Sequence, residues 1–216
     1  PAARPPRSSE TARPARATSR VIDAWQAIRG SRAGCHSLPN GQGGQPVLEL
    51  GCGGGRDTAT LIAAGHRAVA IELSLEAAAR ARERVPSAEI HCQDIRAPFP
   101  LAAGSVGVVV ASLSLHYFDW PETSMLVNRV RTALRPEGVL LCRLNSTNDH
   151  HFGAVGHPEI ERNFYLVDGA PKRFFDRASV DRVFANGWHS IGVEEKVIDR
   201  YDHPKTVWEA VLERDD

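Results

Sequence analysis

The sequence has few of the residues that characterise disulfide-rich, zinc-binding or membrane-spanning proteins. Its 216 residues include four cysteines, and none belongs to a Cys-x-x-Cys pair, so neither a disulfide framework nor a cysteine zinc site is indicated. No apolar run approaches the roughly 20 residues that a spanning helix needs. The first residues also lack the apolar segment of a secretory signal. We therefore expect a cytoplasmic protein that does not contact a membrane.

The sequence also has no net charge, but its charges are unevenly spread. Residues 1–20 carry five arginines and one glutamate, which leaves a charge of −4 on the rest of the chain. A mildly acidic body does not match the basic surface of a nucleic-acid-binding protein, so we expect no nucleic-acid partner. The proline-rich residues 1–19 are predicted to be a disordered basic tail. The alternative is a transit peptide, against which the prolines count.

Residues 20–216 are predicted to form a single α/β domain. We predict a short helix over 21–29, a glycine-rich loop over 30–46, and then a regular alternation of apolar runs with helical stretches. This alternation indicates a doubly wound sheet with helices on both faces. The predicted strands are 47–50, 67–72, 88–92, 106–111, 138–144, 188–199 and 205–213. The predicted helices are 56–64, 75–84, 121–134 and 176–185.

The strongest motif is the run Val-Leu-Glu-Leu-Gly-Cys-Gly-Gly-Gly-Arg-Asp over residues 47–57. It predicts a buried strand, a glycine-rich turn that a ligand can approach closely, and a helix. A nucleotide-hydrolysing loop would need Gly-Lys-Ser/Thr at the helix start, where Arg56 and Asp57 stand. A dinucleotide-binding loop would need a third glycine at position 56. Glu49 precedes Gly51 by two residues, and a carboxylate there suits a cationic ligand such as S-adenosylmethionine.

The same run resembles the first motif of the class I S-adenosylmethionine-dependent methyltransferases. The later motifs follow in order: Glu72 lies 21 residues after Gly51, Asp94-Ile95 follows the third strand, and Ser112 ends the fourth. The resemblance implies a Rossmann-like, seven-stranded, mostly parallel sheet that ends in an antiparallel hairpin. It also implies a set of residues that contact the cofactor S-adenosylmethionine: Glu49, Gly51, Cys52, Gly53, Gly55, Glu72, Leu73, Asp94, Ile95 and Ser112.

Two of these acids have distinct roles in the family that the sequence resembles. Glu72 is expected to accept hydrogen bonds from the ribose diol. Asp94 is expected to contact the adenine amino group. Because each motif follows a predicted strand, all of them are expected at the sheet edge where such folds bind ligands.

The second half resembles a little-characterised bacterial branch of small methyltransferases, itself similar to the tellurite-resistance methyltransferases. The residues that carry this likeness are 145–149, 164–169 and 172–175. Residues 146–173 show no strong period and are predicted to be an insertion on the substrate side. The pocket is expected between this insertion and residues 116–118. The predicted substrate contacts are Asn145, Asn148, Asp149, Tyr165 and Arg173.

His116 and Tyr117 follow the fourth strand at the expected mouth of the site, and we predict that they are the catalytic residues. His116 could be a general base, because its unperturbed pKa lies near neutrality, or it could pack against the cofactor. Three further histidines at 150, 151 and 157 lack the spacing of a metal site, so no metal is predicted.

The predicted function is methyl transfer to a small polar molecule. The alternatives are a methyltransferase for RNA or protein and a non-catalytic S-adenosylmethionine-binding module. Residues 112–115 read Ser-Leu-Ser-Leu where enzymes that methylate amino groups of bases or glutamine carry Asn/Asp-Pro-Pro-Tyr. The oligomeric state cannot be derived from the sequence.

Overall fold

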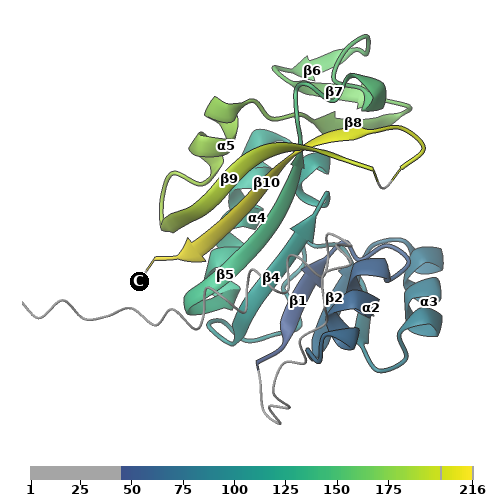
Figure 1. Cartoon of the computed structure of the whole chain (residues 1–216), viewed down its shortest axis with the longest axis vertical. Coiled ribbons are helices and arrows are strands. Elements are labelled where there is room, and N and C mark those ends of the chain that lie inside the picture. Colours follow the sequence, from purple (N-terminus) through teal and green to yellow (C-terminus); the bar gives the residue numbers. More distant parts are fainter. Residues whose placement is uncertain (1–44, 200, 216) are drawn as a thin grey trace, which may run out of the picture.

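A seven-stranded sheet forms the centre of the computed structural model (Figure 1). The structure describes residues 45–199 and 201–215, so the predicted tail, the helix over 21–29 and most of the loop over 30–46 lie outside the described residues. The strand order is β3-β2-β1-β4-β5-β10-β9. The strands are β1 (Val47–Leu50), β2 (Ala68–Glu72), β3 (Glu89–Cys92), β4 (Val106–Ser112), β5 (Leu134–Asn145), β9 (Trp188–Ile198) and β10 (Lys205–Arg214).

Strands β1 to β5 pair in parallel, and β10 pairs antiparallel with both β5 and β9. The predicted seven-stranded sheet with a C-terminal antiparallel hairpin is therefore confirmed. Four α-helices are described: α2 (Arg56–Ala63), α3 (Leu75–Arg84), α4 (Trp120–Ala133) and α5 (Arg177–Val183). In the described residues, none of them is long and apolar enough to cross a membrane.

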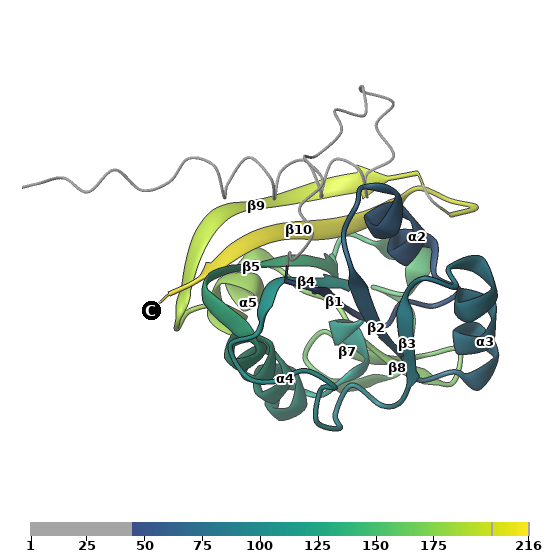
Figure 2. The ribbon, with the colours of Figure 1, turned by 90° about the horizontal axis from the view of Figure 1, so that it is seen from below.

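Helices cover both faces of the sheet, as Figure 2 shows. Side chains alternate along a strand, so Leu48 and Leu50 of β1 point to one face and Val47 to the other. Leu48 and Leu50 belong to the main core with residues of α4 and α5. Val47 packs in a second cluster with Leu61 of α2. This arrangement directs the side chain of Glu49 to the α2 face.

Side-chain caps set the starts of three helices. Ser74 accepts a hydrogen bond from the backbone N–H of Ala77 at the start of α3. Asp119 and Asp176 cap α4 and α5 in the same way. A capping side chain satisfies a backbone donor that has no partner within the helix, which stabilises the helix by about 1 kcal/mol.

Strand β5 begins earlier than the sequence predicts. The sequence predicts that the helix ends at 134 and that the strand begins at 138. In the structure the helix ends at Ala133 and the strand begins at Leu134. Leu134 pairs with Val106, and the register then shifts before Val108. Glu137 within this stretch has a φ of 58°. The extra residues are accommodated in this irregularity, which a periodicity argument does not detect.

The insertion contains a second sheet that the sequence analysis did not predict. It consists of β6 (Glu159–Glu161), β7 (Phe164–Val167) and β8 (Ala170–Arg173). Asp168 and Gly169 both have positive φ, at 51° and 78°, and form the two-residue turn between β7 and β8. Figure 1 shows this small sheet beyond the end of the large sheet where β4 and β5 finish. Strand β8 contacts the short 3-10 helix η1 (Leu115–Tyr117), which follows β4.

A buried ion pair joins β5 to the C-terminal hairpin. Arg143 lies opposite Glu209 of β10, and its Nε and Nη2 atoms donate to Glu209 Oε1 at 3.0 and 2.8 Å. Both side chains are almost completely removed from solvent. The pair lies within the antiparallel pairing of β5 with β10, so it is coupled to the position of the hairpin.

Candidate active site

The turn between β1 and α2 has the geometry of a ligand-binding loop. Gly51, Gly53 and Gly55 all have positive φ, at 70°, 54° and 76°. A Cβ atom on Gly51 would lie 2.8 Å from Ser114 Cβ, and one on Gly55 would lie 3.1 Å from Ala81 Cα. A Cβ atom on Gly53 would meet no described atom within 4 Å. Gly51 and Gly55 are therefore required for packing, whereas Gly53 faces space that a ligand can enter.

Glu49 is positioned under this loop by the first turn of α2. Its side chain is buried, and Thr58 Oγ1 donates to Glu49 Oε2 at 2.6 Å. Burial, and then the charges of Glu49 and Glu72, raise the pKa of the Cys52 thiol to about 12. The loop therefore carries negative charge from Glu49 and Glu72 and a neutral thiol, which suits a cationic ligand.

Glu72 joins the glycine loop to the start of α3. Its Oε2 accepts the backbone N–H of Gly53, and its Oε1 accepts the backbone N–H of Ser74, each at 2.8 Å. Each carboxylate oxygen can accept a second hydrogen bond, so both remain able to accept from hydroxyl groups. Leu73, the next residue, is 67% exposed and presents an apolar surface beside this carboxylate. This pairing of an acceptor with an apolar surface fits a nucleoside.

Asp94 has a partner that sequence reasoning did not anticipate. Arg96 Nε and Nη2 lie 3.0 and 2.6 Å from Asp94 Oδ2, and hydrogen bonds from Arg96 hold the pKa of Asp94 below its usual value. Arg96 also contacts Glu122 at the start of α4. Ile95 is buried in the main core. The adenine contact predicted for Asp94 stays a prediction, and Arg96 fixes the orientation of the carboxylate.

The chain turns sharply where β4 ends at Ser112. Leu113 has a φ of 59°, a conformation that residues with a Cβ atom adopt rarely. Its backbone N–H donates to Arg143 O at 3.0 Å. Backbone strain of this kind is of order 1–3 kcal/mol and is concentrated at functional sites. Leu113 directs the following residues into η1, which carries His116 and Tyr117.

His116 is buried, with only 4% of its surface exposed, and its ring centroid lies 4.0 Å from that of Tyr117. Burial lowers the pKa of His116 to about 3, and the charges of Lys205 and Lys172 contribute. Among the described residues, no hydrogen-bond partner reaches its Nδ1 atom. Burial raises the pKa of Tyr117. At neutral pH the site therefore presents an uncharged imidazole, a weak base, beside a protonated phenol.

The depressed pKa of His116 predicts a specific dependence of stability on pH. An unfolded histidine titrates near 6.5. Below that pH the unfolded chain binds a proton that the folded chain does not bind until about pH 3. The free energy of unfolding should therefore fall by roughly 1.4 kcal/mol per pH unit between pH 6.5 and 3 because of this residue. Urea unfolding from pH 7 to 4 should show a shallower fall for His116→Gln. Equal slopes for the two proteins would contradict the assigned burial effect.

The five predicted substrate residues are largely engaged with the protein itself. Asn145 Nδ2 donates to Arg173 O at 3.4 Å, and Asn148 Nδ2 donates to Glu195 Oε1 at 3.0 Å. Asp149 accepts from Lys205 Nζ at 2.6 Å. These contacts tie the insertion to β8, β9 and β10. In the structure, the contacts of Asn145, Asn148 and Asp149 thus hold the insertion over the large sheet.

Tyr165 and Arg173 lie on opposite faces of the small sheet. Strand register places Tyr165 beside Lys172 and Phe164 beside Arg173. Arg173 Nε donates to Phe118 O at 3.1 Å, and its guanidinium lies 4.6 Å above the Phe164 ring. The structure therefore does not bring Tyr165 and Arg173 together.

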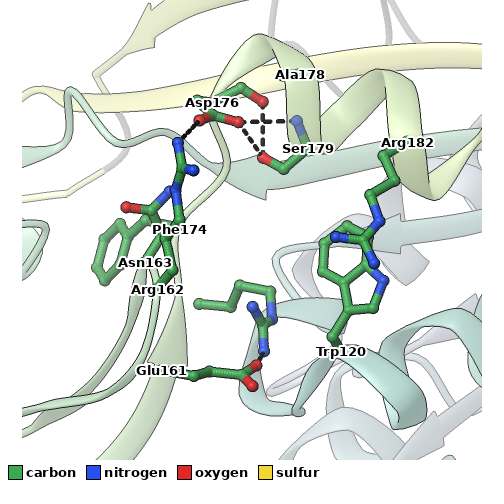
Figure 3. Close-up of a pocket in the computed structure, with 10 residues that line it drawn as sticks. Trp120, Glu161, Arg162, Asn163, Phe174, Asp176, Ala178, Ser179 and Arg182 are labelled. Carbon is green, nitrogen blue, oxygen red and sulfur yellow. Dashed lines mark hydrogen bonds and ion pairs between the residues drawn. The ribbon is translucent and has the colours of Figure 1, made fainter.

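Arg173 lines a separate cavity of about 440 Å³ between α4, α5 and the β6–β7 turn (Figure 3). The arginines around this cavity already contact a carboxylate or an aromatic ring. Arg173 forms an ion pair with Glu161, and Arg162 lies 3.6 Å from Asp176. Arg182 stacks over the Trp120 ring at 4.4 Å. None of the predicted cofactor residues lines this cavity.

Two lysines near His116 were missed by sequence reasoning. Lys172 lies on β8, and the Asp168-Gly169 pair between two short apolar runs is a hairpin signal that could have placed it. Lys205 begins β10 and reaches back to Asp149. Its position follows from pairing between distant strands, and no local pattern predicts it. No cluster of potential metal ligands occurs in residues 45–199 and 201–215.

The described cysteines should differ strongly in reactivity. Cys52 and Cys142 are buried, and burial raises the pKa of both thiols, that of Cys52 to about 12. Cys92 is exposed at the end of β3. Because the thiolate is the reactive form, iodoacetamide at pH 8 should modify Cys92 and leave the two buried thiols intact. Peptide mass spectrometry measures this, and early modification of Cys52 in the folded protein would contradict the buried loop geometry.

Comparisons with known proteins agree with this geometry. Residues 47–138 match the family model described as a methyltransferase domain. An uncharacterised methyltransferase of Synechocystis is 32% identical over 96 residues, 44% of this chain and 45% of that protein. The trans-aconitate 2-methyltransferase of Paracidovorax citrulli is 35% identical over 100 residues, 45% of this chain and 38% of that protein. The matches thus span less than half the length of these curated relatives.

The fold extends the similarity beyond the matched segment. A crystal structure of an S-adenosylmethionine-dependent methyltransferase from Methanosarcina mazei superposes with a TM-score of 0.69 at 16% identity, over 82% of this chain and 95% of that one. Residues 47–138 therefore contain a methyltransferase domain, and the described chain has the fold of an S-adenosylmethionine-dependent methyltransferase. The likeness to the tellurite-resistance branch stays a prediction.

Proposed function

We propose that the protein transfers a methyl group from S-adenosylmethionine to a small polar molecule. The observation that most supports this proposal is the position of the small sheet β6–β8. This sheet covers the end of the large sheet and contacts η1 beside the glycine loop. A covered site favours a small acceptor over an RNA or protein surface. The curated relative named trans-aconitate 2-methyltransferase supports an acceptor of this size.

The residues of the loop fit the methyl donor. Gly53 leaves space for it, Glu72 offers acceptors for hydroxyl groups, and Leu73 offers an apolar surface. When bound, S-adenosylmethionine supplies a methyl group activated by the positive charge on sulfur. The carboxylates of Glu49 and Glu72 contribute negative charge to the site. Alignment of the acceptor and exclusion of water can then supply most of the rate acceleration.

The chemistry around His116 supports an acceptor that needs no base. A group with a pKa of about 3 removes protons poorly at neutral pH. Tyr117 keeps its proton because burial raises its pKa. We infer that His116 and Tyr117 orient the acceptor as hydrogen-bonding groups. General-base catalysis by His116 would then contribute little.

Transfer of label from methyl-labelled S-adenosylmethionine tests this proposal. The protein should label a small-molecule fraction of a bacterial extract and leave the RNA and protein fractions unlabelled. Label in RNA or protein would contradict the small-molecule proposal. Binding of the cofactor product with no label in any fraction would favour a non-catalytic binding module.

A further inference from the structure

Two lysines from different parts of the chain come to the region around η1, and the charges of both act on His116. Lys172 lies on β8, the strand that contacts η1. Side chains alternate along β8, and Arg173 points to the Phe164 face, so Lys172 points to the opposite face. On that face Val167 packs with Ala154, next to the 3-10 helix η2 (His150–Phe152).

Lys205 reaches the same place from β10. Its Nζ lies 4.3 Å from the centre of the Phe152 ring and 2.6 Å from Asp149 Oδ2. Only 7% of the residue is exposed, and burial lowers its pKa. Lys172 contributes to the lowering of the pKa of both Lys205 and His116, as two nearby cations would. The two lysines and the imidazole are therefore close enough to interact electrostatically, and we refer to these three side chains as the cluster.

The charge of this cluster is not balanced by the protein. Asp149 compensates Lys205. No ion pair joins Lys172 to a carboxylate within the described part of the chain. Beside it, the buried Nδ1 atom of His116 has no partner there either. The described part of the chain thus leaves one positive charge without an ion pair and one buried polar atom without a hydrogen bond, and an anion with hydrogen-bonding oxygens would satisfy both.

We propose that this cluster binds a carboxylate group of the methyl acceptor, with Lys172 as its main cationic contact and Lys205 and His116 as further contacts. The inference rests on the proposed function and specifies its substrate class. One net positive charge matches the single charge of a carboxylate. A phosphate carries close to two negative charges at neutral pH and would bring an excess negative charge into a partly buried site.

A carboxylate is also an acceptor that this site can methylate without a base. One carboxylate oxygen forms a bond to the methyl carbon as the methyl–sulfur bond breaks. The electron pair of the broken bond stays on sulfur, so the sulfonium becomes a neutral thioether and the acceptor becomes a methyl ester. No proton is transferred. This step agrees with a neutral, weakly basic His116 and requires no oxidant or further reactant.

The cavity lined by Arg173 does not compete for this role. Arg173 forms an ion pair with Glu161. Arg162 lies beside Asp176, and Arg182 is stacked on Trp120, as Figure 3 shows. An anion that bound Arg162 or Arg173 there would have to displace an existing carboxylate. The cavity nevertheless provides a matched control, because Arg162 is a cation in the same small sheet whose removal should not affect the cluster.

Calorimetric titration tests the proposal through binding alone. Succinate, citrate and benzoate would each be titrated into protein saturated with S-adenosylhomocysteine, and the corresponding amides would serve as uncharged probes. At least one carboxylate should bind, and its amide should bind far more weakly. Lys172→Ala should weaken the carboxylate by about 10- to 100-fold, since it loses a charge-assisted hydrogen bond. Lys172→Arg should restore most of the affinity, and Arg162→Ala should bind like wild type.

Three results would overturn the proposal: equal binding of amides and carboxylates, no binding of any carboxylate, and weakening by Arg162→Ala in place of Lys172→Ala. The labelled product provides an independent check. A methyl ester releases its label as volatile methanol in mild alkali, whereas a methyl group on nitrogen or sulfur stays in the product. Alkali-stable label would reject the carboxylate while leaving methyl transfer intact. Failure to bind S-adenosylhomocysteine at all would instead reject the proposed function.

Discussion

Replacing Glu72 by alanine is expected to weaken the binding of S-adenosylhomocysteine by roughly 30- to 150-fold, or about 2–3 kcal/mol. The variant would lose the carboxylate that we propose accepts hydrogen bonds from the ribose hydroxyl groups. It would also lose its hydrogen bonds with the backbone N–H groups of Gly53 and Ser74, which hold the glycine loop against α3. Isothermal titration calorimetry of wild-type and variant protein measures the change.

Two further variants make the Glu72 experiment specific. Glu72→Gln keeps one carbonyl acceptor and should lose less affinity than Glu72→Ala. Glu76 lies in the first turn of α3, where its exposed carboxylate pairs with Arg80, so Glu76→Ala should bind like wild type. Wild-type affinity in Glu72→Ala, with a loss in Glu76→Ala, would mean that the loop does not present Glu72 to the cofactor.

Replacing Glu209 by alanine is expected to reduce the free energy of unfolding by about 3–5 kcal/mol. The substitution would leave the guanidinium of Arg143 buried between β5 and β10 without the carboxylate that now accepts from its Nε and Nη2 atoms. Such a loss is a large fraction of the stability of a domain of this size. Chemical unfolding monitored by tryptophan fluorescence measures it.

A second substitution separates the buried charge from a general disturbance of the hairpin. Changing Arg143 to methionine in the Glu209→Ala background removes the uncompensated cation, so the double variant should recover part of the lost stability. Glu194 lies on β9 with 68% of its side chain exposed, and Glu194→Ala should change stability little. A double variant no more stable than Glu209→Ala would show that the buried charge is not the cause.

Strand and helix positions could be predicted where the local pattern is strong. The predicted strand over 47–50 and helix over 75–84 have the boundaries that the structure gives β1 and α3. Both are framed by local signals: a glycine turn after β1 and the Ser74 cap before α3. The start of β5 was predicted four residues late because its pairing depends on a register shift against β4. A contact between strands leaves no local pattern.

In the candidate site, too, residues set by a local motif could be predicted, whereas residues that depend on distant strands could not. The glycine loop and Glu72 follow directly from a motif, because their geometry is set within one strand–turn–helix unit and the strand beside it. The surroundings of Asp149 and His116 depend on Lys205, which lies 56 residues after Asp149 in the chain. Sequence reasoning placed Asp149 facing the substrate, whereas the structure pairs it with that lysine. Partners from distant elements determine whether a polar residue is available to a ligand.

The most direct test of the whole account is the choice of ligand by the glycine loop. S-adenosylhomocysteine at 100 times its dissociation constant should stabilise the folded protein by about 2.7 kcal/mol and raise its melting temperature accordingly. NAD and ATP at the same concentration should leave the melting temperature unchanged, because Arg56 and Asp57 occupy the positions where phosphate-binding loops need glycine or lysine. A shift with NAD alone, and none with S-adenosylhomocysteine, would contradict the account.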